Sequence, residues 1–306
     1  MRRTMIPAVG GSRITWHDLP ATAQEAVAEI LGAPVTRAAS QAGGFSPGTA
    51  DRVLTAAGTR AFVKAVSPDQ NHMSPEMARR EAVICAALPA ATRAPRLKGT
   101  FDDGHWVVLV FDDIDGRHPR TPWVKDELDA AVSAVRELAR SLTPSPFPGG
   151  RTAAETLAGD FGGWNRIAAD PPADLEPWLF PRLDELRARA AAGLASLVGD
   201  TLVHLDVRPD NMLITPAGEV FFVDWPWGCN GPDWLDLALL ALNVEVHGGD
   251  GDALLPAAGV DAVIGFTGFF LDQSRQPPPP GLPTVRAFQR AQGDALLPWM
   301  RRRLKG

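Results

Sequence analysis

Residues of four chemically useful types lie close together in the segment HLDVRPDNML, which runs from His204 to Leu213. The segment is flanked by two apolar runs, TLV at 201–203 and MLI at 212–214. Polar groups beside buried strands are costly unless each finds a partner. The segment is therefore either an unusually polar turn or a place where charge is required.

The spacing His-x-Asp-x-x-x-x-Asn occurs here once, at His204, Asp206 and Asn211. A further aspartate, Asp224, ends the apolar run FFVDW. Kinases that transfer a phosphoryl group need a base for the acceptor hydroxyl and oxygen ligands for Mg²⁺. Asn and Asp supply such oxygens. The spacing therefore favours phosphoryl transfer from a magnesium-bound nucleoside triphosphate.

With these motifs the chain resembles the aminoglycoside phosphotransferase family, whose members share the protein-kinase-like fold. The resemblance covers nearly the whole chain, in family order. It implies that Asp206 is the catalytic aspartate, that Asn211 and Asp224 bind Mg²⁺, and that His204 anchors the loop without carrying protons. Asp236, in DWLDLALLAL, resembles the aspartate that binds the backbone of the catalytic loop. An ordinary aspartate pKa near 4 is expected to suffice for Asp206.

A lysine, Lys64, stands inside the apolar run AFVKAV. It fits the solvent face of an edge strand, or the kinase lysine that holds the α- and β-phosphates and pairs with a helix glutamate. We favour the second interpretation. Glu81 is the expected partner because it begins an apolar helical face, whereas Glu76, in the first turn, is better placed to stabilise the helix dipole.

Two backbone segments are candidates for binding the nucleotide. The glycine-rich stretch GGFSPG, at 43–48, stands where kinases cover the phosphates, and Ser46 is a candidate donor to phosphate, although an ordinary hairpin turn would look the same. The polar link after VLVF is where the family binds adenine. The resemblance implies the Asp112 carbonyl and the Ile114 amide as the adenine contacts.

Arg208 follows the expected catalytic aspartate by two residues. Its guanidinium is suited to stabilising charge on the phosphate in the transition state. A salt bridge to Asp210 explains it equally well. Both interpretations stay open.

The surrounding pattern predicts an α+β, bilobal, protein-kinase-like fold. A helix over 19–32, three strands within 35–66, a helix over 74–88 and a hairpin over 96–111 form a small β-rich lobe, residues 1–111. Ser74 is its expected helix N-cap. Residues 112–306 form a larger helical lobe with the catalytic loop and acceptor site. The run PPPPGLP is expected to be an exposed connection between helices.

The composition excludes several other classes of protein. The 306 residues carry a net charge of -6, which argues against a nucleic-acid partner. No apolar stretch is long enough to cross a membrane. The two cysteines, Cys85 and Cys229, have no metal-binding spacing and suit a reducing cytoplasm. The expected location is cytoplasmic, and the sequence does not indicate an oligomeric state.

The expected function is transfer of the γ-phosphate of ATP (or GTP), with Mg²⁺, to a hydroxyl of a small molecule, antibiotics included. Alternatives are a kinase of an amino alcohol, homoserine or sugar, and a non-catalytic nucleotide-binding protein. A protein kinase is disfavoured because no APE-type segment follows Asp224. The basic end MRRRLKG would repel a polycationic aminoglycoside if it closed the acceptor pocket, so weak activity on such drugs is expected.

Overall fold

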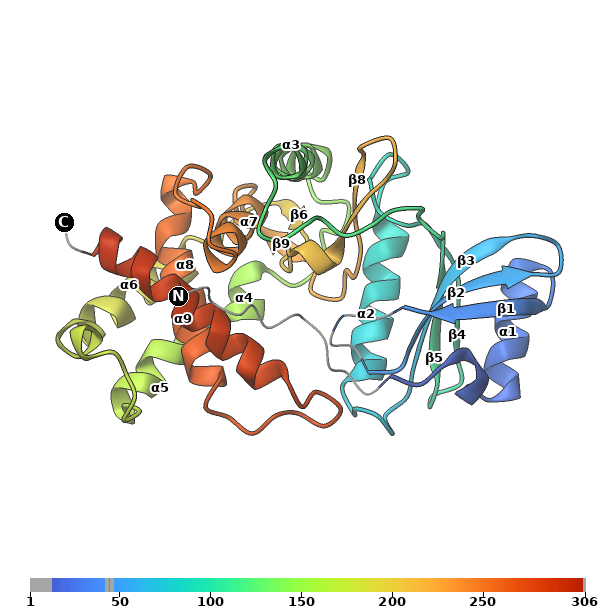
Figure 1. Cartoon of the computed structure of the whole chain (residues 1–306), viewed down its shortest axis with the longest axis horizontal. Coiled ribbons are helices and arrows are strands. Elements are labelled where there is room, and N and C mark those ends of the chain that lie inside the picture. Colours follow the sequence, from blue (N-terminus) through green and yellow to red (C-terminus); the bar gives the residue numbers. More distant parts are fainter. Residues whose placement is uncertain (1–12, 42–43, 45–46, 305–306) are drawn as a thin grey trace.

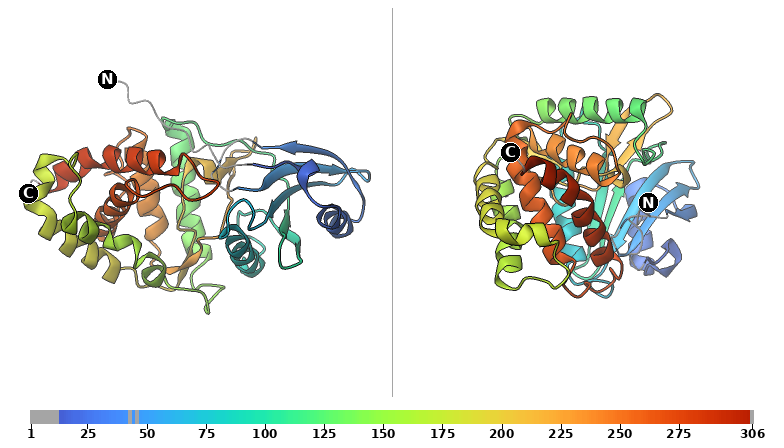
Figure 2. Two further views of the ribbon diagram at one scale, coloured as in Figure 1. Left: turned by 90° about the horizontal axis from the view of Figure 1, so that it is seen from below. Right: turned by 60° about the vertical axis from the view of Figure 1, so that its left-hand side comes forward.

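The computed structural model describes residues 13–41, 44 and 47–304 of the chain. An N-terminal part built on an antiparallel sheet is joined to a larger, mostly helical part, and the molecule is elongated along the line that joins them (Figures 1 and 2). The expected α+β architecture with two lobes is therefore observed.

The N-terminal lobe contains a five-stranded sheet in the order β1-β2-β3-β5-β4. Its elements are α1 (Ala21–Leu31), β1 (Val35–Ser40), β2 (Thr49–Thr55), β3 (Arg60–Val66), α2 (Ser74–Ala87), β4 (Leu97–Asp102) and β5 (Val107–Phe111), after a 3-10 turn at Trp16–Asp18. Strand β3, which carries Lys64, is the central strand and not an edge strand. A solvent-facing edge position for this lysine is therefore ruled out.

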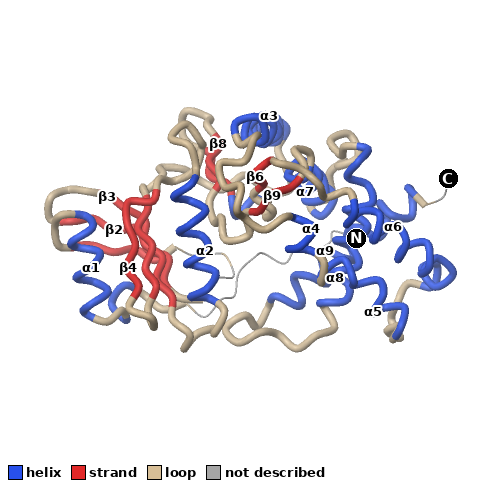
Figure 3. The backbone as a smooth tube through the Cα atoms, turned by 180° about the vertical axis from the view of Figure 1, so that it is seen from behind, coloured by secondary structure: helices blue, strands red, loops and turns tan. Residues whose placement is uncertain are grey.

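Strand β5 separates two hydrophobic cores. Val107, Leu109 and Phe111 pack into a core that continues through α2 into the helical lobe. Val108 and Val110 pack on the opposite face, with the residues of α1. Because side chains alternate along a strand, all five residues are buried. The sheet therefore has α1 on one face and α2 on the other, and α2 lies between the sheet and the helical lobe (Figures 1 and 3).

The C-terminal lobe consists of helices around two short hairpin-like ladders, β6 with β9 and β7 with β8. Its elements are α3 (Lys125–Ser141), α4 (Ala153–Leu157), α5 (Gly163–Ala169), α6 (Leu183–Ala195), β6 (Thr201–Val203), β7 (Met212–Ile214), β8 (Val220–Phe222), β9 (Cys229–Gly231), α7 (Leu235–Val246), α8 (Val260–Gln273) and α9 (Val285–Arg303). Short 3-10 turns lie at Asp160–Gly162, Pro177–Arg182, Pro209–Asn211 and Ala257–Gly259. No helix in the described part of the chain is long and apolar enough to cross a membrane.

The proline run between α8 and α9 does more than connect two helices. Three of its four consecutive prolines are exposed, as expected, but the loop reaches across to the N-terminal lobe (Figure 1). There the Pro280 carbonyl accepts a hydrogen bond of 2.8 Å from the Asn71 side-chain nitrogen. A Cβ added to Gly281 would lie 3.3 Å from the Pro47 ring. The run is therefore a strap that connects the helical lobe to the loops of the N-terminal lobe that carry Pro47 and Asn71.

Asn71 also organises the start of α2. Its Oδ1 accepts a hydrogen bond of 2.8 Å from the Met73 amide. The helix begins at Ser74, and Met73 occupies the cap position. The expectation that Ser74 is the N-cap is therefore wrong, because a side chain two residues before Met73 binds the backbone of the incoming turn.

Replacing Asn71 tests the strap. Asn71→Ala removes both hydrogen bonds of a buried side chain, so we expect a loss of about 1–3 kcal/mol in unfolding free energy. Asn71→Asp is the matched variant. It keeps the oxygen that accepts from the Met73 amide, but it replaces the nitrogen that donates to the Pro280 carbonyl with a second oxygen, which cannot donate. Both variants should have a lower melting temperature than the wild type. An Asn71→Asp protein as stable as the wild type would show that only the contact with Met73 matters.

Candidate active site

One buried carboxylate binds the backbone of the loop that follows β6. Asp236, at the start of α7, accepts hydrogen bonds from the amides of His204 (2.8 Å) and Leu205 (2.9 Å). Leu205 has a φ of 65°, which L-residues seldom adopt. The two hydrogen bonds stabilise this turn, as the resemblance implied for Asp236, and thereby set the direction of the residues that follow.

His204 anchors the loop from within. Its side chain is fully buried and lies edge-on to Trp225, with ring centroids 4.6 Å apart. The ring nitrogen Nε2 lies 3.0 Å from the Val223 carbonyl, and Nδ1 accepts a hydrogen bond from the Asp206 amide. Since a carbonyl only accepts, Nε2 carries the proton. Burial lowers the pKa of His204, so the ring is neutral and serves as a structural anchor.

The Asp206 carboxylate is partly exposed and lies beside Arg208 and Asn211. Its side chain is 22% exposed, and Oδ2 accepts a hydrogen bond of 2.8 Å from the Asn211 side-chain nitrogen. Burial raises the pKa of Asp206 to about 6, although the nearby Arg208 guanidinium opposes the change. The pKa of Asp206 therefore lies above the ordinary value near 4, because desolvation of this carboxylate outweighs its cationic neighbour.

Asn211 and Asp224 lie on adjacent segments of backbone. Strand β8 ends at Phe222, and the Val223 amide donates to the Asn211 carbonyl at 3.0 Å. Asp224 follows with a φ of 68°. Because the Asn211 nitrogen is bound to Asp206, its Oδ1 is the atom left for a cation. This amide oxygen and the Asp224 carboxylate form a hard donor set that fits Mg²⁺.

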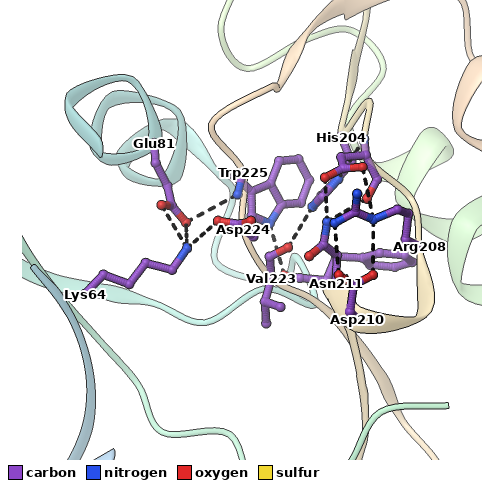
Figure 4. A network of polar contacts seen from close by, with 11 residues as sticks. Lys64, Glu81, His204, Arg208, Asp210, Asn211, Val223, Asp224 and Trp225 are labelled. Carbon is purple, nitrogen blue, oxygen red and sulfur yellow. Dashed lines mark hydrogen bonds and ion pairs between the residues drawn. The ribbon is translucent and has the colours of Figure 1, made fainter. Parts of the chain in front are cut away.

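The Lys64 ammonium joins the two lobes. It lies 2.7 Å from a Glu81 oxygen and 2.6 Å from an Asp224 oxygen (Figure 4). Glu81, on α2, is buried, and it is indeed this glutamate and not Glu76 that pairs with the lysine. Burial alone would lower the pKa of Lys64, but the two carboxylates outweigh it and raise the pKa. The lysine is therefore charged at neutral pH.

Arg208 forms the salt bridge with Asp210 that was one of its two interpretations. It forms two hydrogen bonds with Asp210, of 3.1 and 2.9 Å, and its Nε lies 3.5 Å from Asp206 Oδ1 (Figure 4). Its guanidinium also lies over the Phe288 ring of α9, 5.5 Å from the centroid. The salt bridge is present, and the guanidinium still lies beside the carboxylate expected to take the proton.

The described residues of the glycine-rich stretch, Gly44, Pro47 and Gly48, lie between β1 and β2. A Cβ on Gly48, which has a φ of +108°, would come within 2.4 Å of the Ala65 carbonyl oxygen, so only glycine fits there. Ser46, the candidate phosphate donor, lies outside the described residues.

The link between the lobes is held by contacts that the sequence analysis did not single out. The Ile114 carbonyl accepts a hydrogen bond of 2.8 Å from Arg52, and the Asp112 carboxylate lies 2.6 Å from the Lys98 ammonium. Asp113, with a side chain only 2% exposed, forms ion pairs with Arg52 (3.0 Å) and Arg60 (2.7 Å). The acidic pair in FDDIDG was the available signal, but the partners of Asp113 lie more than 50 residues earlier in the sequence.

A cavity of about 430 Å³ in the helical lobe is not part of this cluster. It is lined by Arg290, Asp294 and Arg301, which lie on one face of α9. Phe288, which contacts Arg208, projects from nearly the opposite face of this helix, because two residues correspond to about 200°. The cavity therefore lies on the far side of α9 from the catalytic loop.

The basic end of the chain does not close the acceptor side of the cluster. Helix α9 runs away from the N-terminal lobe and ends at the far end of the helical lobe (Figure 1). Arg302 and Arg303 pair there with Glu245 and Asp252. The described part of the basic end therefore does not close the acceptor pocket, and electrostatic repulsion gives no reason to expect weak activity on aminoglycosides.

Comparison with solved structures shows the fold. Choline kinase LicA from Streptococcus pneumoniae has a TM-score of 0.56 and 16% identity, over 89% of this chain and 96% of that one. The ethanolamine kinase from Plasmodium vivax has a TM-score of 0.53 and 14% identity, over 94% and 86%. An aminoglycoside phosphotransferase from Alicyclobacillus acidocaldarius has a TM-score of 0.49 and 17% identity, over 89% and 93%. The expected protein-kinase-like fold is confirmed.

Most of the chain also matches a protein family. No curated protein matches the chain. The model of the phosphotransferase enzyme family (APH) matches residues 42–264, which include the glycine-rich stretch, Lys64, the catalytic loop and Asp224. The match covers well over half of the chain, and so the chain belongs to the phosphotransferase enzyme family.

Proposed function

We propose that this phosphotransferase moves the γ-phosphate of ATP (or GTP) to a hydroxyl of a small molecule. One observation carries the proposal: the Lys64 ammonium binds Glu81 and Asp224 at once, beside a loop whose Asp206 carboxylate is partly exposed. A structural ion pair would need only one partner. Three charged groups from both lobes suit a site that binds phosphates.

The N-terminal lobe, proposed as residues 1–111, binds the nucleotide. The backbone of the link at Asp112 and Ile114 receives the adenine, the glycine-rich stretch with Ser46 covers the phosphates, and Lys64 contacts the α- and β-phosphates. Asn211 and Asp224 would hold Mg²⁺, which when bound neutralises phosphate charge. The site retains every charged group of this machinery, which argues against a non-catalytic nucleotide-binding protein.

Residues 112–306 supply the chemistry. Asp206 orients the acceptor hydroxyl and takes its proton as the new O–P bond forms, while the bond from the γ-phosphorus to the β-phosphate oxygen breaks. The products are the phosphorylated acceptor, the nucleoside diphosphate and one proton. The guanidinium of Arg208, beside Asp206, stabilises negative charge on the phosphoryl oxygens during transfer.

The acceptor remains a choice between an antibiotic and a small metabolite. Structures of the same fold are named for choline and ethanolamine, and the aminoglycoside argument based on the basic tail no longer applies. The panel of acceptors must therefore include amino alcohols, aminoglycosides, homoserine and sugars. We also propose a cytoplasmic location, which the two free, buried cysteines support.

Nucleotide consumption with this panel tests the proposed reaction. We expect turnover with at least one acceptor class and a fall in kcat of roughly 10²-fold or more in Asp206→Asn, the scale of general-base catalysis. Folding and nucleotide binding should survive, since the substitution keeps the shape of the side chain. Near-normal kcat in Asp206→Asn, at an unchanged melting temperature, would contradict the proposed role of this carboxylate.

Calorimetry tests the magnesium site. Asp224→Ala should weaken ADP binding in the presence of Mg²⁺ by about tenfold or more, since a charged ligand is lost, and should remove most of the difference between measurements with and without Mg²⁺. Asp250→Ala, which removes an exposed aspartate elsewhere in the helical lobe, is the matched control. Equal magnesium-dependent affinity in Asp224→Ala and the wild type would rule the assignment out.

The pH dependence of kcat/KM for the acceptor reports on Asp206. The carboxylate must be ionised to take a proton, and its pKa is raised to about 6. Activity should therefore be complete above this value and fall about tenfold per pH unit below it. The pKa of Lys64 is raised and that of Asp224 is lowered, so neither titrates in this window. An acidic limb centred near pH 4 would show that burial does not control the base.

A further inference from the structure

An arginine before the first helix lies under the glycine-rich stretch. Arg13 forms a parallel bridge with Gly48, and the adjacent Ile14 amide donates to the Gly48 carbonyl at 3.3 Å. A Cβ on Gly44 would lie 3.1 Å from the Arg13 nitrogen Nη2. The guanidinium is therefore packed against the backbone of this stretch at Gly44.

Two carboxylates act electrostatically on the Arg13 guanidinium. Burial lowers the pKa of Arg13, and the carboxylates of Asp224 and Asp51 both oppose this change. Asp224 is the residue that binds Lys64 from the opposite side of the cleft. Arg13 thus reaches the electrostatic field of the same carboxylate from the side of the glycine-rich stretch.

We propose that Arg13 is a phosphate-binding residue that contacts the β- or γ-phosphate of the nucleotide from beneath the glycine-rich stretch. The inference rests on the proposed function, because it assumes a nucleoside triphosphate in this cleft. It adds a residue from outside the segment matched by the family model, which begins at residue 42.

The charge balance of the cluster supports this assignment. Carboxylates outnumber cations by four to two among Glu81, Asp206, Asp210, Asp224, Lys64 and Arg208. A triphosphate brings further negative charge. A cation on the side of the glycine-rich stretch would neutralise part of this charge on phosphate oxygens that Lys64 does not contact. Arginine suits this task, because its planar group can donate two parallel hydrogen bonds to one phosphate.

Asp51 offers a purely structural alternative. Its side chain is 1% exposed; one oxygen accepts a hydrogen bond of 2.5 Å from the Ser40 hydroxyl, while the other has no hydrogen-bond partner among the described residues. Burial raises the pKa of Asp51, and Arg13 opposes this. If neutralising Asp51 were the whole role of Arg13, losing the arginine would lower stability without regard to the number of phosphates on the ligand.

Calorimetric binding of ADP and AMP, both with Mg²⁺, separates the two roles. We expect Arg13→Gln to weaken ADP binding by about tenfold or more and to change AMP binding by less than about twofold, since AMP lacks the contacted phosphates. Arg37→Gln, which removes an exposed arginine from β1 in the same lobe, should leave both affinities unchanged. Arg13→Lys keeps the charge but loses the planar group with its two parallel donors, and should give an intermediate ADP affinity.

The outcomes distinguish this inference from the proposed function. An unchanged ratio of ADP to AMP affinity in Arg13→Gln, with a lower melting temperature, would overturn the phosphate contact and leave Arg13 a purely structural role. If Arg13→Gln does not fold, an Arg13→Lys protein with wild-type ADP affinity would overturn it equally. A wild-type protein that binds neither nucleotide would overturn the proposed function, and the inference with it.

Discussion

The arrangement of the cleft depends on a buried ammonium group shared between two carboxylates. Lys64 comes from the central strand of the sheet, Glu81 from the helix behind it, and Asp224 from the helical lobe. Removing charges from water is expensive, and each of these groups is tolerated because the others are present. Loss of the lysine would leave two like charges facing each other. These two ion pairs therefore connect the two lobes through one shared cation, at the place where we propose that the phosphates bind.

The catalytic loop is a second place where buried polar groups satisfy one another. Asp236 binds two backbone amides, His204 binds the Val223 carbonyl, and Asn211 binds Asp206. These partners hold Leu205 and the later Asp224 in left-handed conformations that cost of order 1–3 kcal/mol each. Leu205 directly precedes Asp206, so both unusual conformations lie at the carboxylates proposed for phosphoryl transfer. The polar segment at 204–213 is thus a hydrogen-bonded network in which the polar side chains find partners.

Contacts away from the cluster also connect the lobes. Asp113 ties the link to two strands of the sheet, and the proline strap reaches from α9 to Asn71. Helix α9 also carries Phe288, which packs on Arg208 beside the expected base. The strap and the start of α9 therefore contact both the N-terminal lobe and Arg208.

The local pattern of residues was enough for the secondary structure, the kinase-like order of elements, the pairing of Lys64 with Glu81 and the grouping of Asp206, Asn211 and Asp224. Periodicity and motif spacing are local properties, so they can be read along the chain. The raised pKa of Asp206, the binding of Asp113 to Arg52, the strap at Pro280 and the place of Arg13 under Gly44 could not be read in this way. Desolvation depends on everything packed around a group, and these contacts join residues far apart in sequence. Whether the basic end of the chain approached the acceptor likewise depended on the direction of α9, which only tertiary packing decided.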